Sequence, residues 1–533
     1  MSKINSEINT KNNVKIWLSN KIIKLERIKN RWETYSWYIH FDKKPNLLEW
    51  INLSVNNKTE DPQIFFEDFF STNKIANKCF WPFINMIKKE KKYYNNSDNN
   101  EDYFKIKERE INYASHMDSY IYSYYSYVLN EKYNNYISNY RINDEILAYR
   151  NIKNEWTKWN KNNIHFAKDS FEQIMITKDC YVFAFDITWF FDNLDWWILY
   201  DKVACILWKK EIWSDWNNIL KSITNYSYVE KNDLYEYNLI NRNTKVIDTK
   251  GFHKAKKDYK LNNCWAKLVK KSSSNKWVAQ WIWISQNLAN IYMLDFDLYI
   301  SDLVEKLWWK YYRYSDDILI VAKYDKNNKI DIYNKIQNEV FNYIKKVKLD
   351  IQPKKTDIFD FNWWILRESF SFDESYNKFV KDKNTKSLQY LWFSFDWKSV
   401  LVRNKTITKH YWKMNYALDK YKEIYFTSKK INSINKCKYI SSLINIKSFR
   451  ELKIDFKKLN KRFTHSWILW KWNDYSNFYW YVKQSNIIMT ELADKFWINV
   501  KIMTQLSKYQ NNYNKALKKR WLTNLFTNKN SND

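Results

Sequence analysis

The chain has 533 residues, of which 28% are charged and 45% hydrophobic, and this balance excludes a disordered or collagen-like protein. Its net charge of +30 indicates a polyanionic partner such as nucleic acid, although the abundance of Lys, Asn, Ile and Tyr could also reflect an AT-rich genome. We find no apolar run long enough for a membrane span, no apolar leader at the start and no C-x-x-C pair among the five cysteines, so we expect a cytoplasmic protein without a membrane partner.

The glycine and tryptophan counts are abnormal. The sequence contains 1 Gly and 30 Trp, and their combined number approaches the roughly 37 glycines expected at an average usage of about 7%. Tight turns need glycine because it adopts a positive φ without strain. We therefore hypothesise that most of the Trp letters are UGA codons that the organism decodes as glycine, as in certain uncultured bacterial lineages. Trp17 and Trp32, in a helical pattern, are candidates for genuine tryptophan.

Patterns along the chain predict a mixed α+β fold. Amphipathic spacing predicts a helix within residues 1–35, and polar residues predict a loop over 94–102. A Tyr-rich helix is expected over 117–137, an insertion with short strands over about 225–275, and a helix over 285–305. An Asp-Trp pair at 396–397, between two strand-like runs, predicts a type I′ hairpin turn if residue 397 is glycine. From Thr406 onward helical periodicity dominates.

Two predicted strands end in carboxylates. The apolar run Tyr181–Phe185 leads into Asp186, and the Asp316–Asp317 pair lies at the tip of a predicted hairpin between two apolar runs. Adjacent carboxylates repel each other unless a cation neutralises them. Oxygen ligands without His or Cys favour Mg²⁺, and two such ions can stabilise both oxygens of a phosphoryl transfer.

A third motif lies between these strands. Residues 279–292, with glycine in place of each Trp, become A-Q-G-I-G-I-S-Q-N-L-A-N-I-Y, a glycine loop that enters a helix. Such a loop suits backbone contact with a nucleotide or a template base. Genuine tryptophans would block it, so Trp281 is the position at which the two interpretations differ most.

In this order, the three segments resemble the palm motifs of reverse transcriptases. Tyr314–Asp317 resembles the Y-x-D-D box, Asp186–Phe191 the D-x-x-x-x-F/Y box, and Gln280–Ser285 the Q-G-x-x-x-S loop. Residues 107–111 resemble the K-x-R-x-I strand of the fingers, and residues 349–356 resemble the lysine segment after the Y-x-D-D hairpin. Residues 390–393 resemble the primer grip. The resemblance covers about residues 100–405. It implies a right-hand polymerase with an N-terminal extension and fingers over 1–180, a palm over 181–404 and a helical thumb over 405–533.

The resemblance also implies roles for individual residues. The catalytic acids would be Asp186, Asp316 and Asp317, and Lys354 or Lys355, of which we take Lys355, would protonate the leaving pyrophosphate. Two Mg²⁺ ions would be held by Asp186, Ile187, Asp316 and Asp317. Lys107 and Arg109 would hold the triphosphate, and Phe191 would select the deoxyribose. The nucleotide-binding loop would contain Gln280, Trp281 and Ser285.

The N-terminal segments at 36–42, 80–84 and 111–118 resemble those of bacterial defence-associated reverse transcriptases, which copy a small non-coding RNA. The implied partners are an RNA template, a DNA product or primer, and dNTPs. Enzymes of diversity-generating retroelements, retrons or group II introns are alternatives, and a non-catalytic RNA-binding scaffold is an alternative of another class. Four basic residues at 457–462, beside Phe463, suit contact with the template–primer duplex. The sequence gives no preference for an oligomeric state.

Overall fold

The computed structural model of the chain describes residues 11–21, 41–42, 62–95, 102–154, 160–208, 212–240, 246–262, 268–272, 278–279, 282, 284–324, 329–363, 365–373, 375, 378–434, 463, 478–507 and 509–520. The predicted mixture of helices and strands is confirmed, and most of the described strand pairs are antiparallel. Gln280, Trp281 and the basic residues at 457–462 lie outside the described residues. Within the described residues, no helix is both long and apolar enough to cross a membrane.

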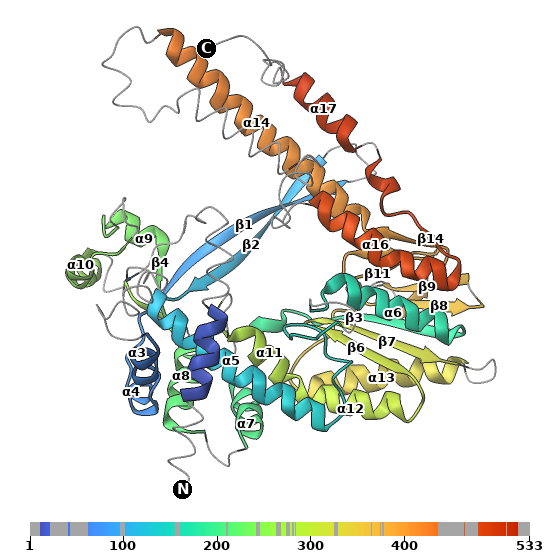
Figure 1. Cartoon of the computed structure of the whole chain (residues 1–533), viewed down its shortest axis with the longest axis horizontal. Coiled ribbons are helices and arrows are strands. Elements are labelled where there is room, and N and C mark those ends of the chain that lie inside the picture. Colours follow the sequence, from blue (N-terminus) through green and yellow to red (C-terminus); the bar gives the residue numbers. More distant parts are fainter. Residues whose placement is uncertain are drawn as a thin grey trace.

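The central element is a six-stranded sheet in the order β10-β9-β8-β3-β7-β6 (Figure 1). Its strands are β3 (Cys180–Asp186), β6 (Lys310–Tyr314), β7 (Asp317–Lys323), β8 (Asp357–Asn362), β9 (Ile365–Asp373) and β10 (Lys378–Lys381), and each pairs antiparallel with its neighbours. On β3, Phe183 and Phe185 join one core while Val182 joins the other. Because both faces are buried, the strand is apolar almost throughout and ends at its first acid, Asp186.

Helices cover both faces of this sheet (Figure 1). One core lies beneath α5 (His116–Asn139), α7 (Trp196–Ile206), α8 (Ser214–Thr224), α11 (Ser285–Tyr292), α12 (Leu294–Glu305) and α13 (Lys329–Lys346). The other core lies beneath α6 (Asn163–Thr177), α16 (Phe478–Phe496) and the start of α14 (Asn404–Ile434). The helices predicted at 117–137 and 285–305 are thus confirmed, the latter as α11 and α12.

A second sheet carries a long hairpin that is separate from the central sheet and runs towards α14 in the view of Figure 1. Its order is β2-β1-β4-β5, formed by β1 (Phe83–Asn95), β2 (Asp102–Tyr113), β4 (Ser227–Glu230) and β5 (Lys270–Lys271). The predicted insertion at 225–275 contains β4, β5 and the helices α9 (Lys231–Glu236) and α10 (Thr249–Asn262), which pack in a small third core. The helices α3 (Pro62–Phe69) and α4 (Thr72–Ala76) precede the hairpin.

The last part of the described chain is mainly helical, as predicted, with one exception. A small sheet in the order β11-β12-β13-β14 joins β11 (Leu388–Tyr390), β12 (Phe393–Phe395) and β13 (Ser399–Val402) to β14 (Asn499–Val500). The parallel pairing of β13 with β14 ties the chain end to the residues before α14. The helix α17 (Tyr509–Lys519) contacts α14, and Arg520 forms an ion pair with Asp419.

The β12–β13 turn differs from the predicted type I′ turn. Phe395 pairs with Val400, so Trp397 and Lys398 are the two central residues, and of these only Trp397 has a positive φ, of 71°. A positive φ at the first central position alone is the pattern of a type II′ turn, which favours glycine there. Asp396 moves out of the turn centre because its carboxylate accepts hydrogen bonds from the Lys398 and Ser399 amides.

Tryptophan repeatedly occupies left-handed backbone. Of the fourteen described non-glycine residues with a positive φ, seven are Trp, at 189, 208, 308, 363, 392, 397 and 497. Trp308 follows α12 in a Schellman motif, because its amide donates to Glu305 and the next amide donates to Val304. Its side chain is 89% exposed and that of Trp497, after α16, is 93% exposed. Trp17 is the opposite case, since it is 2% exposed and donates to Ser123 Oγ.

Candidate active site

The acids predicted from the two motifs meet on neighbouring strands. Asp186, the last residue of β3, is the register partner of Asp317, the first residue of β7. The Ile187 amide donates to the Asp316 carbonyl at 3.1 Å. The predicted hairpin tip is confirmed, because Tyr314 pairs with Asp317 across a two-residue turn of Ser315 and Asp316. Residues 130 positions apart in the sequence therefore form one acidic edge.

Burial and mutual repulsion favour the protonated forms of Asp316 and Asp317. Burial, then the charges of Asp316 and Asp186, raise the pKa of Asp317 to about 7. Burial also raises the pKa of Asp316, and the Asp186 charge adds to it. Arg403, which directly follows β13, lowers the pKa of Asp317 in part. No sequence pattern singled out Arg403, because its proximity to the acids arises only from the return of the chain through the small sheet.

Lys355 is a cation in contact with this edge. Its Nζ lies 2.7 Å from Asp186 Oδ2 and 3.1 Å from Oδ1. It ends a short 3-10 helix, η2 (Pro353–Lys355), that is held against β3 because the Gln352 amide donates to the Asp186 carbonyl and the Thr188 amide to the Asp350 carbonyl. Of the two candidate lysines, the structure thus brings Lys355 to the acids.

The donor chemistry of the edge fits Mg²⁺, which prefers carboxylate oxygens. Within the described ranges, however, no three acidic, His or Cys side chains are grouped closely enough to hold a metal ion. Both oxygens of Asp186 accept from Lys355 instead. Ile187 has a buried apolar side chain, so its carbonyl is the only group with which it could bind a cation. A cation at Asp186 would share its carboxylate with the Lys355 ammonium or take the place of that ammonium.

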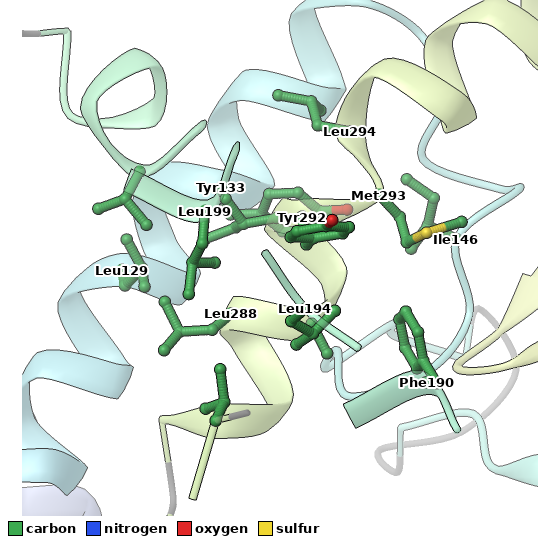
Figure 2. Close-up of a cluster of buried hydrophobic side chains, with 14 of the residues drawn as sticks. Leu129, Tyr133, Ile146, Phe190, Leu194, Leu199, Leu288, Tyr292, Met293 and Leu294 are labelled. Atoms are coloured by element: carbon green, nitrogen blue, oxygen red, sulfur yellow. The ribbon is translucent and has the colours of Figure 1, made fainter. Parts of the chain in front are cut away.

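The two phenylalanines after Asp186 have different environments. Phe190 and Phe191 lie in the 3-10 helix η1 (Phe190–Asp192), which follows Trp189 in a left-handed conformation with φ 48° and ψ 44°. Figure 2 shows Phe190 in the hydrophobic cluster with Leu194 and Tyr292, and its side chain is 4% exposed. Phe191 is only partly buried, at the rim of that core. Of the pair, Phe190 is therefore a core residue.

Ser285 begins α11 and is buried, and its hydroxyl donates to the Ala279 carbonyl at 2.7 Å. The Ala279 amide in turn donates to the Ile223 carbonyl at the end of α8. These contacts close the two ends of the 279–285 loop on each other, although its centre, with Gln280 and Trp281, lies outside the described residues.

Lys107 and Arg109 are not on the sheet of the acids. Both lie on β2, where Lys107 faces Glu90 and Arg109 faces Lys88 across the hairpin. Lys107 is exposed and Arg109 is half-buried. The long hairpin therefore carries both predicted triphosphate ligands on a different element from the acidic edge.

No protein-family model and no curated protein matches this chain. Among solved structures, it is similar to apo telomerase from Candida tropicalis truncated from its C-terminal domain, with a TM-score of 0.31, 12% identity and coverage of 63% of this chain and 59% of that one. Telomerase from Candida albicans in complex with a TWJ fragment of telomeric RNA gives a TM-score of 0.32, 12% identity and coverage of 83% and 60%. The chain thus spans less than two thirds of either protein. Because these TM-scores are low, we base no argument on them.

Proposed function

We propose that this chain is an RNA-directed DNA polymerase, a reverse transcriptase, which uses an RNA template, a DNA primer or product strand and dNTPs. The observation that carries the proposal is the acidic edge, where Asp186 is in register with Asp317 and its neighbour Ile187 is bonded to Asp316. Burial and repulsion disfavour the charged forms of Asp316 and Asp317 there unless a cation binds. A purely structural turn has no need of them.

The proposal assigns fingers and an N-terminal extension to 1–180, a palm to 181–404 and a thumb to 405–533. The six-stranded sheet with the acids at its edge would be the palm. The β1–β2 hairpin, with Lys107 and Arg109, would lie over the triphosphate. The helices α14, α16 and α17 would hold the template–primer duplex, which agrees with the basic charge of the chain.

Two Mg²⁺ ions bound by Asp186, Asp316, Asp317 and the Ile187 carbonyl would stabilise the attacking and leaving oxygens of the transfer. The Lys355 ammonium, which lies 2.7 Å from Asp186 Oδ2, would give a proton to the departing pyrophosphate. Phe191, at the rim of the core, is the ring available to pack against the sugar.

The test is primer extension on an RNA template with Asp316→Asn. We expect incorporation to be abolished while RNA binding is retained, because the substitution removes a metal ligand and leaves the fold. Asp494→Asn, an exposed acid on α16, is the matched control and should keep full activity. Full activity of Asp316→Asn would contradict the proposal. A wild-type chain that binds RNA without any incorporation would favour the RNA-binding scaffold.

The proposal includes glycine at the recoded positions. A left-handed φ is unfavourable for a bulky residue, and seven Trp positions adopt it in the described chain. Helices α7, α12 and α16 are each followed by such a Trp, at 208, 308 and 497, where proteins commonly use glycine. Trp189, in the turn between Asp186 and Phe191, is another. These positions support the hypothesis, and buried Trp17 is supported as a genuine tryptophan.

Peptide mass spectrometry of the natively expressed protein tests this directly. We expect glycine at 189, 281 and 308 and tryptophan at 17. Tryptophan at 281 would remove the glycine loop from the proposed nucleotide site. Biochemical assays should use a chain with glycine restored at the positions where the spectra show it.

We also propose that the enzyme acts in antiphage defence with a non-coding RNA template. The support is the resemblance of the N-terminal segments, and the test is phage plating on cells that carry the gene and its flanking DNA. Protection should be lost with Asp316→Asn. A variable-repeat gene or an intron in the flanking DNA would instead favour a diversity-generating retroelement or a group II intron enzyme.

A further inference from the structure

The turn that carries Asp316 is strained and is held from several sides. Ser315 has a φ of 62°, a left-handed conformation that costs a non-glycine residue on the order of 1 kcal/mol or more. The Ser315 carbonyl accepts from Arg313 Nη1 at 3.2 Å, and its hydroxyl lies 2.9 Å from the Tyr149 hydroxyl. Beyond it, the Asp316 carbonyl accepts from the Ile187 amide. Strain of this kind persists only where the surroundings fix the backbone.

Arg313 is fully buried and is anchored on Asp297 of α12. Its Nε and Nη2 donate to the two Asp297 oxygens at 2.7 and 2.6 Å, and its Nη1 also contacts Asn290 Oδ1 at 3.2 Å. Tyr311 donates a further hydrogen bond to Asp297 at 2.6 Å. Both ions have no exposed side-chain surface.

A buried ion pair is a poor way to gain stability, because well-packed apolar residues often stabilise as much or more. The planar guanidinium offers something that an apolar side chain lacks, namely donors in a fixed fork. The Nε and Nη2 atoms of Arg313 donate to Asp297, and its Nη1 atom donates to the Ser315 carbonyl. The backbone amide of Arg313 also donates to Glu145, which joins the strand to the segment that carries Tyr149.

We propose that Arg313 is a positioning residue. Anchored on Asp297, and together with Tyr149, whose hydroxyl contacts that of Ser315, it holds Ser315 in the left-handed conformation that directs Asp316 towards Asp186. This inference rests on the proposed polymerase activity. If it is right, the charge pair fixes the geometry of the acids, and the substrate does not touch it.

Three variants separate positioning from stability. Arg313→Lys keeps the charge but loses the fork, and we expect kcat for dNTP incorporation to fall by about 100-fold, the order expected for a misplacement of about 1 Å, with KM nearly unchanged. Tyr311→Phe removes a hydrogen bond to Asp297 without touching Ser315, so it should lower the melting temperature and leave kcat near that of the wild type. Tyr149→Phe, a milder change, should lower kcat without a large loss of stability.

The decisive measurement is Arg313→Lys in a Ser315→Gly background. Glycine adopts a positive φ without strain, so the turn no longer needs the contacts of Arg313 and Tyr149 to hold it. The loss of kcat caused by Arg313→Lys should therefore shrink to less than about tenfold. A purely structural Arg313 would give the same loss in both backgrounds and would overturn the inference. Wild-type kcat in both Arg313→Lys and Tyr149→Phe would do so too.

Hydrogen exchange of the 314–318 amides and Mn²⁺ binding followed by electron paramagnetic resonance provide readouts that need no catalysis. Both should change in Arg313→Lys and recover in the Ser315→Gly background. If the wild type incorporates no dNTP, the polymerase proposal fails, whereas these two measurements still decide whether Arg313 holds the turn.

Discussion

Replacing Trp308 with glycine should stabilise the protein. The left-handed conformation of Trp308 costs a residue with a side chain about 1–2 kcal/mol, which glycine would not lose. Glycine also makes the unfolded chain more flexible, and this lowers the free energy of unfolding by about 0.4–1 kcal/mol. The 89% exposed side chain contributes little packing. The expected net gain is about 1 kcal/mol, or a rise in melting temperature of about 2–4 °C for the cooperative unit that contains α12.

Trp17→Gly is the matched control of opposite sign. Its side chain is 2% exposed and packs edge-on against Phe66 and Phe70 inside a helix. Loss of a buried tryptophan costs about 3–5 kcal/mol, and glycine inside a helix costs about 1 kcal/mol more. Thermal and urea unfolding of the two variants measure both effects. A Trp308→Gly chain less stable than the same chain with Trp308 would refute the reasoning about left-handed tryptophans.

Other predictions concern the acidic edge. Phe191→Ala should admit ribonucleotides while retaining much of the DNA synthesis, measured by comparing dNTP and rNTP incorporation; a wild type that uses both sugars equally would contradict the assignment. Lys355→Met should lower kcat by about 10²-fold or more if Lys355 is the proton donor, whereas Lys354→Met, an equally exposed neighbour on η2, should not. The raised pKa of Asp317, about 7 against 3.8 for an ordinary Asp, means that the folded state binds the proton more tightly. The metal-free protein should therefore be most stable below about pH 4 with respect to this group and lose that contribution as the pH rises to about 7, and Asp317→Asn should flatten this part of the pH profile of thermal unfolding.

The local sequence pattern alone predicted that the acids lie at a strand end and at a hairpin tip. An apolar strand that ends in Asp186 and a short turn between two apolar runs are features of single segments, and the structure has both where the sequence predicts them. The same is true of α5 and of the α11–α12 pair. The composition also marked the excess of tryptophan, because one glycine is too few for a chain of this length.

Only the tertiary structure decided which groups surround those acids. The register of β3 against β7 sets Asp186 beside Asp317, and the return of η2 to β3 brings the Lys355 ammonium to Asp186. The Arg313–Asp297 pair joins a strand to a helix, and no local sequence pattern predicts that these two residues pair. Strand register and helix packing depend on contacts between segments far apart in the sequence, whereas periodicity reports only the face that each segment buries.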